Sequence, residues 1–307
     1  MTIVIAGLMR AARLTSGFVF IAALALPAAA QERKFKPLAV KTPDGLTISA
    51  QEWGNTSGLE ILFIHGFSQA SLSWSRQVQS ELAKDFRMVT YDLRGHGNSD
   101  KPFEPEKYKE SKYWADEVQA IIDAAGLKRP VLVGWSYGGR VIADYLRVHG
   151  TSRLAGLNYV DALSKGDPSF FGDGLKPLPL MASEDLSVNI AATRQFLRNC
   201  FERQPSAEDF EIMLAFNMMT PPKVRAAMGG RQLQMDDFLR NMRLPVLVTQ
   251  GDKDRLVLPA AAKHTAETIP GAKLSVYAGV GHAPFYEDAA RFNAELAAFV
   301  REANKGY

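Results

Sequence analysis

The pattern of apolar and polar positions along the chain predicts strands of two kinds. Residues 45–53 alternate between polar and apolar side chains, which is typical of an antiparallel edge strand with one buried face. Residues 60–64, 87–91 and 130–133 are nearly continuous apolar runs, as expected for strands covered on both faces. Between them, residues 114–126 have helical spacing and end in a glycine. Strands that alternate with helices indicate a mostly parallel sheet with right-handed crossovers.

The alternation continues to the end of the chain after one interruption. Residues 157–160 and 244–250 are short apolar runs, residues 272–277 alternate, and residues 287–301 are an amphipathic helical stretch. Between about residues 164 and 237, glycines and prolines are followed by helix-like segments without strands. We therefore expect a helical insertion within an α/β sheet.

One motif lies at the junction of an expected strand and an expected helix. Gly134, Ser136 and Gly138 form a Gly-x-Ser-x-Gly pattern between the apolar run at 129–133 and the helix-like stretch at 139–146. In this context the pattern is a nucleophile elbow, a sharp turn that exposes the serine oxygen at the end of the sheet. The amides that open the following helix can stabilise an anion beside it.

An acid and a base follow Ser136 in the order that this architecture uses. Asp254 comes after the expected strand at 244–250, and His282 comes after the expected strand at 272–277. Along the chain, the order Ser, Asp, His is the order found in the fold that uses a nucleophile elbow. Other serine hydrolase folds have their triad residues in a different order.

With these motifs, the chain resembles α/β-hydrolase fold proteins of the esterase, haloperoxidase and epoxide-hydrolase-like group, from about residue 37 to residue 300. The motifs that carry the resemblance are His65-Gly66-Phe67, residues 91–99, the elbow, Gly251-Asp252-Lys253-Asp254 and Gly281-His282. The resemblance implies a mostly parallel, eight-stranded sheet with helices on both faces. It also implies a helical cap at residues 164–237, between core segments at residues 31–163 and 238–307.

Two further aspartates remain candidates for the acid. Asp252 lies in the same turn as Asp254. Asp161 closes the apolar run that precedes it, at another strand end where some members of the resembled family place their acid. We favour Asp254.

The residue types predict a covalent mechanism. Serine is a weak nucleophile at neutral pH, so His282 would take the proton of Ser136, and Asp254 would orient the imidazole. The backbone amide of Tyr137 is one expected oxyanion donor, and the resemblance implies Phe67 as the second. Water would then hydrolyse the acyl-enzyme, a reaction that requires no metal and no organic cofactor. Since histidine has an unperturbed pKa near about 6.5, turnover should fall on acidification through that region.

The substrate pocket is expected to include His65, Trp135 and Met218, with His65 chiefly shaping the oxyanion loop. The expected cap is rich in methionine, which fills irregular apolar space and is used for packing as well as for pockets. These methionines are Met181, Met213, Met218, Met219, Met228 and Met235. Asp92, Arg94 and His96 are expected to form a hydrogen-bonded loop.

The elbow residue narrows the expected reaction. Relatives that hydrolyse epoxides or carbon–halogen bonds have aspartate where this chain has Ser136. We therefore expect an esterase acting on small to medium, largely apolar esters. A perhydrolase or cofactor-free haloperoxidase, and a lactone or carbon–carbon bond hydrolase, would use the same triad. From another class, a non-catalytic ligand-binding receptor of this fold is the remaining alternative.

The N-terminus has the pattern of a secretory signal peptide at residues 1–30. An apolar stretch at 14–26 follows a basic region and precedes small residues, which predicts cleavage between Ala30 and Gln31. Met9 would also serve as the start of such a signal. The apolar stretch is shorter than the ~20 residues that a membrane span needs. We expect a periplasmic or secreted protein without stable membrane insertion after cleavage.

Charge and cysteine content add little to this picture. The formal net charge is +3, and Arg10 and Arg13 of the leader are two of the 36 basic residues. This balance does not suggest a nucleic-acid partner, and the expected partner is a small-molecule ester. The single cysteine, Cys200, allows no intramolecular disulfide and is expected to be buried.

Overall fold

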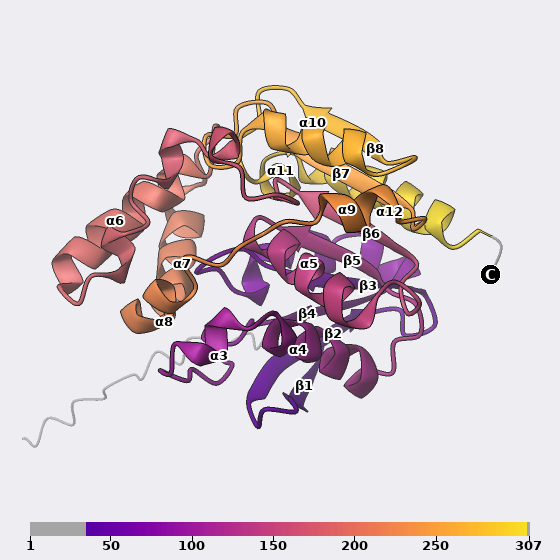
Figure 1. The fold of residues 1–307 in the computed structure, drawn as a ribbon, viewed down its shortest axis with the longest axis horizontal. Helices are drawn as coiled ribbons and strands as arrows, with labels where there is room; N and C mark the ends of the chain where they lie inside the picture. The colour runs from indigo at the N-terminus through magenta and orange to yellow at the C-terminus, as the bar shows by residue number, and fades with distance from the viewer. Residues whose placement is uncertain (1–34, 306–307) are drawn as a thin grey trace, which may run out of the picture. The chain divides into compact units, whose positions relative to one another are not determined.

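A computed structural model describes residues 35–305. The chain between these limits is built around one eight-stranded sheet with the order β1-β2-β4-β3-β5-β6-β7-β8 (Figure 1). The strands are β1 (Phe35–Lys41), β2 (Thr47–Gly54), β3 (Leu59–Ile64), β4 (Phe86–Tyr91), β5 (Val131–Trp135), β6 (Gly156–Val160), β7 (Val246–Gly251) and β8 (Lys273–Tyr277). The pairs β1–β2 and β2–β4 are antiparallel and the other pairs are parallel. This confirms the expected fold class.

The edge of the sheet differs from the expectation. β2 is not the edge strand, because β1 pairs with its outer side along its whole length. The side chains of β1 are mostly exposed or half-buried, so the strand has no strict apolar alternation. Backbone pairing with β2 forms this strand, and a hydrophobic pattern does not report such pairing.

Helices cover both faces of the sheet. They are α1 (Ser75–Val78), α2 (Leu82–Asp85), α3 (Glu106–Lys109), α4 (Ser111–Ala124), α5 (Tyr137–His149), α6 (Leu186–Asn199), α7 (Ala207–Met218), α8 (Pro222–Ala227), α9 (Asp236–Arg240), α10 (Pro259–Thr268), α11 (Pro284–Glu287) and α12 (Ala289–Ala303). Successive side chains of a strand point to opposite faces, so Leu62 and Ile64 join one hydrophobic cluster with α4 and α5. Ile61 and Phe63 join the other, with α12.

The segment between β6 and β7 contains α6, α7 and α8, where the sequence predicts a cap. In Figure 1 these helices lie together at one side, away from α12. Two of them begin at capping residues that accept hydrogen bonds from the first turn. The Asp185 carboxylate caps α6, and the Ser206 hydroxyl caps α7.

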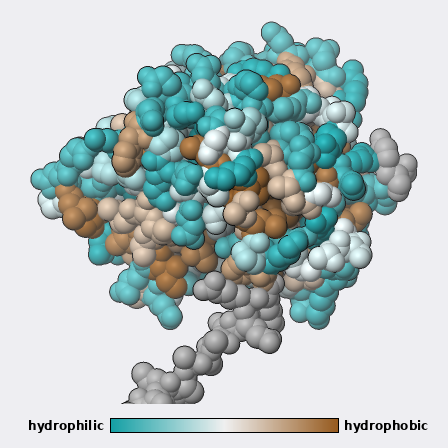
Figure 2. Space-filling model, turned by 90° about the horizontal axis from the view of Figure 1, so that it is seen from below, coloured by the Kyte–Doolittle hydropathy of each residue, from teal (hydrophilic) through white to brown (hydrophobic). Residues whose placement is uncertain are grey.

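The expected signal peptide and its cleavage site lie outside the described residues. Within residues 35–305, no helix has the length and apolar character needed to cross a bilayer. On the face seen in Figure 2, hydrophobic groups form separate areas within a mainly hydrophilic surface. Cys200 is buried and unpaired, as expected.

Candidate active site

Ser136 occupies a strained turn between β5 and α5. Its φ angle is +55°, a region that non-glycine residues rarely adopt. The flanking glycines permit this turn, because a Cβ on Gly134 would lie 2.6 Å from Ile142 and a Cβ on Gly138 would lie 2.5 Å from the Ile64 carbonyl. The strand and helix therefore approach as closely as a nucleophile elbow requires.

Two backbone amides lie close to this serine. A Cβ on Gly66 would be 3.2 Å from the Ser136 Cβ, which places the loop after β3 against the elbow. Among the described residues, the Phe67 amide forms no hydrogen bond with a backbone acceptor. Tyr137 is the first residue of α5, so its amide has no partner within the helix. Both residues line the same cavity as Ser136.

Two buried histidines hold the loop that carries Phe67. The His65 Nε2 atom accepts a 3.0 Å hydrogen bond from the Leu93 amide, and the His96 Nε2 atom accepts one of 3.1 Å from the Ser68 amide. Burial lowers the pKa of His65 to about 4 and that of His96 to about 3, so both rings are neutral. Both nitrogens of His65 contact backbone groups, which explains why this residue supports the loop and does not line the cavity.

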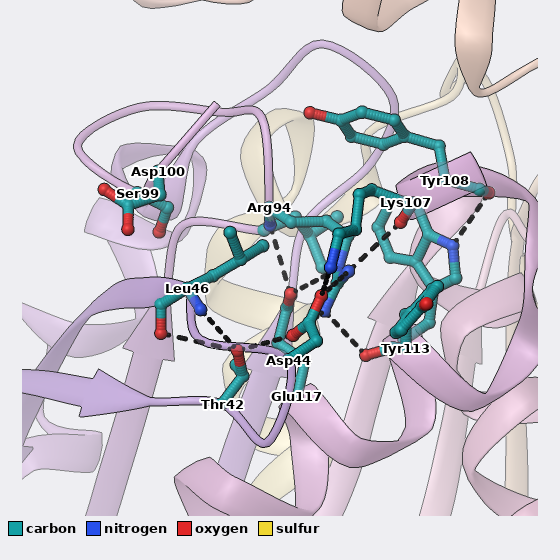
Figure 3. Close-up of polar contacts among 12 residues, drawn as sticks. Thr42, Asp44, Leu46, Arg94, Ser99, Asp100, Lys107, Tyr108, Tyr113 and Glu117 are labelled. Atoms are coloured by element: carbon teal, nitrogen blue, oxygen red, sulfur yellow. Dashed lines mark hydrogen bonds and ion pairs between the residues drawn. The ribbon is translucent and has the colours of Figure 1, made fainter. Parts of the chain in front are cut away.

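The loop that follows β4 is anchored by a buried arginine (Figure 3). The Arg94 guanidinium lies 2.9 Å from Glu117 and 3.1 Å from Asp44. It also donates to the carbonyls of Lys107 and Tyr113. This network fixes the loop that carries His96, and so acts indirectly on the Phe67 loop.

A buried acid–base pair lies beside the elbow. The His282 Nδ1 atom is 2.7 Å from Asp254 Oδ2. The other oxygen of Asp254 accepts hydrogen bonds from the amides of Leu256 (2.8 Å) and Val257 (3.1 Å). The indole of Trp135, the residue before the serine, donates to the His282 carbonyl at 2.7 Å. The His282 Nε2 atom has no hydrogen-bond partner among residues 35–305, so no hydrogen bond joins it to Ser136.

The other two candidate acids lie differently. Asp252 accepts a hydrogen bond from the Gly279 amide, and no hydrogen bond or ion pair joins it to His282. Asp161 is fully buried at the end of β6, where its Oδ1 atom accepts a 2.8 Å hydrogen bond from Gly251. Burial, and next the charge of Asp254, raise the pKa of Asp161 well above its usual range.

Asp161 therefore adds a second carboxyl group to the pair. One ligand atom each from Asp161, Asp254 and His282 lie within 4.8 Å of one another, close enough to hold a metal ion. Because His282 Nδ1 already contacts Asp254, the observed contacts are those of a carboxylate that orients an imidazole.

Ser136 opens onto a cavity of about 430 Å³. Its wall is mainly apolar and includes Phe67, Leu163, Phe171, Leu175, Phe196 and Met228. Met218 does not line it, and Trp135 instead lines a second cavity of about 170 Å³. The Met218 sulfur lies 4.0 Å from the Arg225 guanidinium, which occupies the cavity wall.

Sequence reasoning did not anticipate the three arginines in this wall, Arg140, Arg225 and Arg231. Only for Arg140 does the sequence contain a feature that predicts a position near Ser136. Arg140 lies in the first turn of the helix that begins directly after Ser136, so its place near the elbow follows from the sequence. The other two come from the insertion, whose path the sequence does not reveal.

The chain is similar to known hydrolases over most of its length. A profile of the alpha/beta hydrolase family matches residues 61–295. The bifunctional esterase/perhydrolase DCH of Acinetobacter calcoaceticus is 28% identical over 286 residues, covering 85% of this chain and 99% of that protein. The non-heme chloroperoxidase of Streptomyces lividans is also 28% identical, with the same coverage of both chains.

Two solved structures are more similar in sequence. A protein assigned as an aryl esterase from Burkholderia cenocepacia is 37% identical with a TM-score of 0.84, covering 87% of this chain and 99% of its own. The esterase RhEst1 from a Rhodococcus species is 35% identical with a TM-score of 0.82, covering 88% of this chain and 100% of its own.

Proposed function

Because this chain belongs to the alpha/beta hydrolase family, we propose that it is a serine esterase that cleaves small to medium, largely apolar carboxylic esters through an acyl-enzyme. The observation that carries the proposal is the contact between His282 and Asp254 beside the elbow of Ser136. Asp254 would hold the imidazole with its proton on Nδ1. The partnerless Nε2 atom would then be free to accept the serine proton.

The remaining groups supply what acyl transfer needs. The Ser136 oxygen would attack the ester carbonyl, and the amides of Phe67 and Tyr137 would stabilise the oxyanion. His282 would give its proton to the leaving alcohol and then activate water against the acyl-enzyme. Hydrogen bonds between nucleophile and base are often long before substrate binds, which is compatible with the missing contact between Ser136 and His282.

The test is hydrolysis of p-nitrophenyl butyrate by the Ser136→Ala variant. We expect activity to be lost while the melting temperature stays close to that of the wild type. Ser152→Ala, which changes an exposed serine in a loop, is the matched control and should remain active. Residual activity of Ser136→Ala within tenfold of the wild type would contradict the proposal.

A perhydrolase is the second candidate, favoured by the relatives whose names include that activity or haloperoxidase activity. It would use the same serine, with peroxide in place of water as the second nucleophile. Peracid formation from acetate and hydrogen peroxide distinguishes the two, because an esterase without perhydrolase activity forms none above the uncatalysed rate.

The leader supports export to the periplasm or the medium. We propose that a signal peptidase cuts between Ala30 and Gln31. N-terminal sequencing of the exported protein tests this, and a first residue other than Gln31 would refute the cut.

A further inference from the structure

Of the residues that the structure describes, three cationic side chains and no acidic one line the cavity at Ser136. Arg140, Arg225 and Arg231 line it. Arg231 has a counter-ion, since its Nη2 atom lies 2.6 Å from Asp144. Among the described residues, no carboxylate lies within 4.0 Å of either Arg140 or Arg225. The cavity wall therefore carries more positive charge than Asp144 neutralises.

Arg225 is the most unusual of the three, because it is only 3% exposed and its partners within residues 35–305 are all neutral groups. It donates to the carbonyls of Met181 and Asn217 and to the side chains of Asn189 and Thr193. Its Nε atom is buried without a partner among the described residues, and burial lowers its pKa to about 10. A buried cation without a carboxylate is costly, and an anion bound in the cavity would offset that cost.

Arg140 places a second positive charge close to the nucleophile. It lies in the first turn of α5, directly after the elbow, and lines the same cavity as Ser136. Within residues 35–305, its side chain forms a single hydrogen bond, to the Arg231 carbonyl at 2.8 Å. The nearby acid, Asp144, is already paired with Arg231 and forms no ion pair with Arg140.

We propose that this cavity binds the carboxylate of an anionic ester, so that the enzyme prefers esters that carry a second, ionised carboxyl group. Monoesters of short dicarboxylic acids are the simplest members of this class. The apolar wall would contact the methylene chain and Arg140 would contact the carboxylate, while Arg225 would add positive charge to the same wall. This inference rests on the proposed esterase function and adds a substrate class to it.

Three esters test the inference on the full-length enzyme. Mono-p-nitrophenyl glutarate carries its carboxylate on the acyl side, 4-carboxyphenyl butyrate carries it on the alcohol side, and p-nitrophenyl butyrate is neutral. In the wild type, we expect one of the charged esters to exceed the neutral one in kcat/KM by about tenfold or more, and high salt to weaken that preference. Which charged ester is favoured identifies the part of the substrate that enters the cavity.

Arg140→Gln should remove most of this preference, because it deletes a charge from the cavity wall. We expect about a tenfold loss for the favoured charged ester and less than about a threefold change for the neutral one. Arg140→Lys should restore most of the preference. Arg194→Gln, which removes an exposed arginine from α6, is the matched control and should keep the wild-type preference.

The outcomes separate this inference from the esterase proposal. If the wild type hydrolyses the neutral ester and shows no preference for a charged one, the inference fails and the esterase proposal stands. Equal losses for all three esters in Arg140→Gln would also overturn it. If no ester is hydrolysed, the esterase proposal fails. In that case, calorimetry of glutarate and butyrate binding to Ser136→Ala still tests the inference. Glutarate should bind more tightly than butyrate, because it carries a second carboxylate for the arginines of the cavity wall. Equal affinities would overturn the inference.

Discussion

The Nδ1 atom of His282 lies 2.7 Å from the Oδ2 atom of Asp254, and both side chains are almost completely buried. The second carboxylate oxygen is held by the amides of Leu256 and Val257. The carboxylate therefore cannot turn away from the imidazole without losing hydrogen bonds in a buried site. This arrangement fixes the ring orientation and the tautomer before substrate binds.

Replacing the acid should slow the reaction without unfolding the protein. Asp254→Asn keeps the shape of the side chain but removes the charge that stabilises the imidazolium, so kcat should fall about 10³- to 10⁴-fold. Asp252→Asn, in the same turn, is the control and should stay within about tenfold of the wild type, because no hydrogen bond or ion pair joins Asp252 to His282. Steady-state kinetics on a neutral aryl ester measure both, and an Asp254→Asn enzyme as active as the control would contradict the assigned role.

The neighbouring Asp161 should behave as a protonated acid in the folded protein. Burial and the charge of Asp254 raise its pKa well above 3.8, so the folded state retains a proton that the unfolded chain releases. The free energy of unfolding contributed by this group therefore falls as the pH rises above about 4.

Asp161→Asn should remove this fall in the free energy of unfolding at higher pH. An amide resembles the protonated acid and keeps an acceptor for the Gly251 amide. We expect the variant to gain stability relative to the wild type as the pH rises from 5 to 8, in urea unfolding experiments. Asp237→Asn, at a fully exposed position, is the control. A gain that is the same at both pH values would show that Asp161 is already ionised.

The sequence predicted the parallel strands, the elbow and the order of Ser136, Asp254 and His282, because each depends on a local pattern at a strand end. It favoured Asp254 over Asp252 and Asp161, but no local pattern decided between them. That choice depends on the turn after β7, whose amides at Leu256 and Val257 orient the Asp254 carboxylate. Backbone amides are common to nearly all residue types, so the sequence does not indicate which of them will donate to a carboxylate.

The residues of the cavity wall were less predictable than Ser136, Asp254 and His282. Met218 and Met228 are both methionines of the insertion, yet only Met228 lines the cavity, since the choice depends on how α7 and α8 pack. Arg225 looks like an ordinary surface residue in a polar helix. Its burial follows from acceptors on α6 and α7, which only the tertiary structure brings together.

The loop beside Ser136 should tolerate no side chain at Gly66. A Cβ there would lie 3.2 Å from the Ser136 Cβ and 3.3 Å from the Trp135 ring, so the loop would shift and move the Phe67 amide. Gly66→Ala should lower kcat by about 10²-fold or more, as expected when an oxyanion donor is displaced, with a smaller effect on KM. Gly166→Ala is the control, because a Cβ there would have only ordinary contacts at 3.5 Å or beyond. Equal kcat values for the two variants would show that the loop accommodates the methyl group.

The two neutral histidines that hold this loop should make the protein sensitive to acid. In the folded state the pKa of His65 is about 4 and that of His96 about 3, against 6.5 for a free histidine. Between pH 6.5 and about 4 the unfolded chain binds protons that the folded chain excludes, so the free energy of unfolding falls as the pH falls. A shift of this size corresponds to roughly 3 kcal/mol for each histidine at the acidic end of the range.

His96→Gln should flatten this dependence, because glutamine offers an acceptor to the Ser68 amide but takes up no proton. At pH 8, where both histidines are neutral in either state, the variant differs from the wild type only by its altered contacts, so this value serves as the internal reference. Urea unfolding at pH 8, 6 and 5 measures the change. We expect the wild type to lose stability more steeply than His96→Gln on acidification. Parallel curves would show that His96 is protonated in the folded protein, and that the loop carrying Phe67 does not depend on a neutral imidazole.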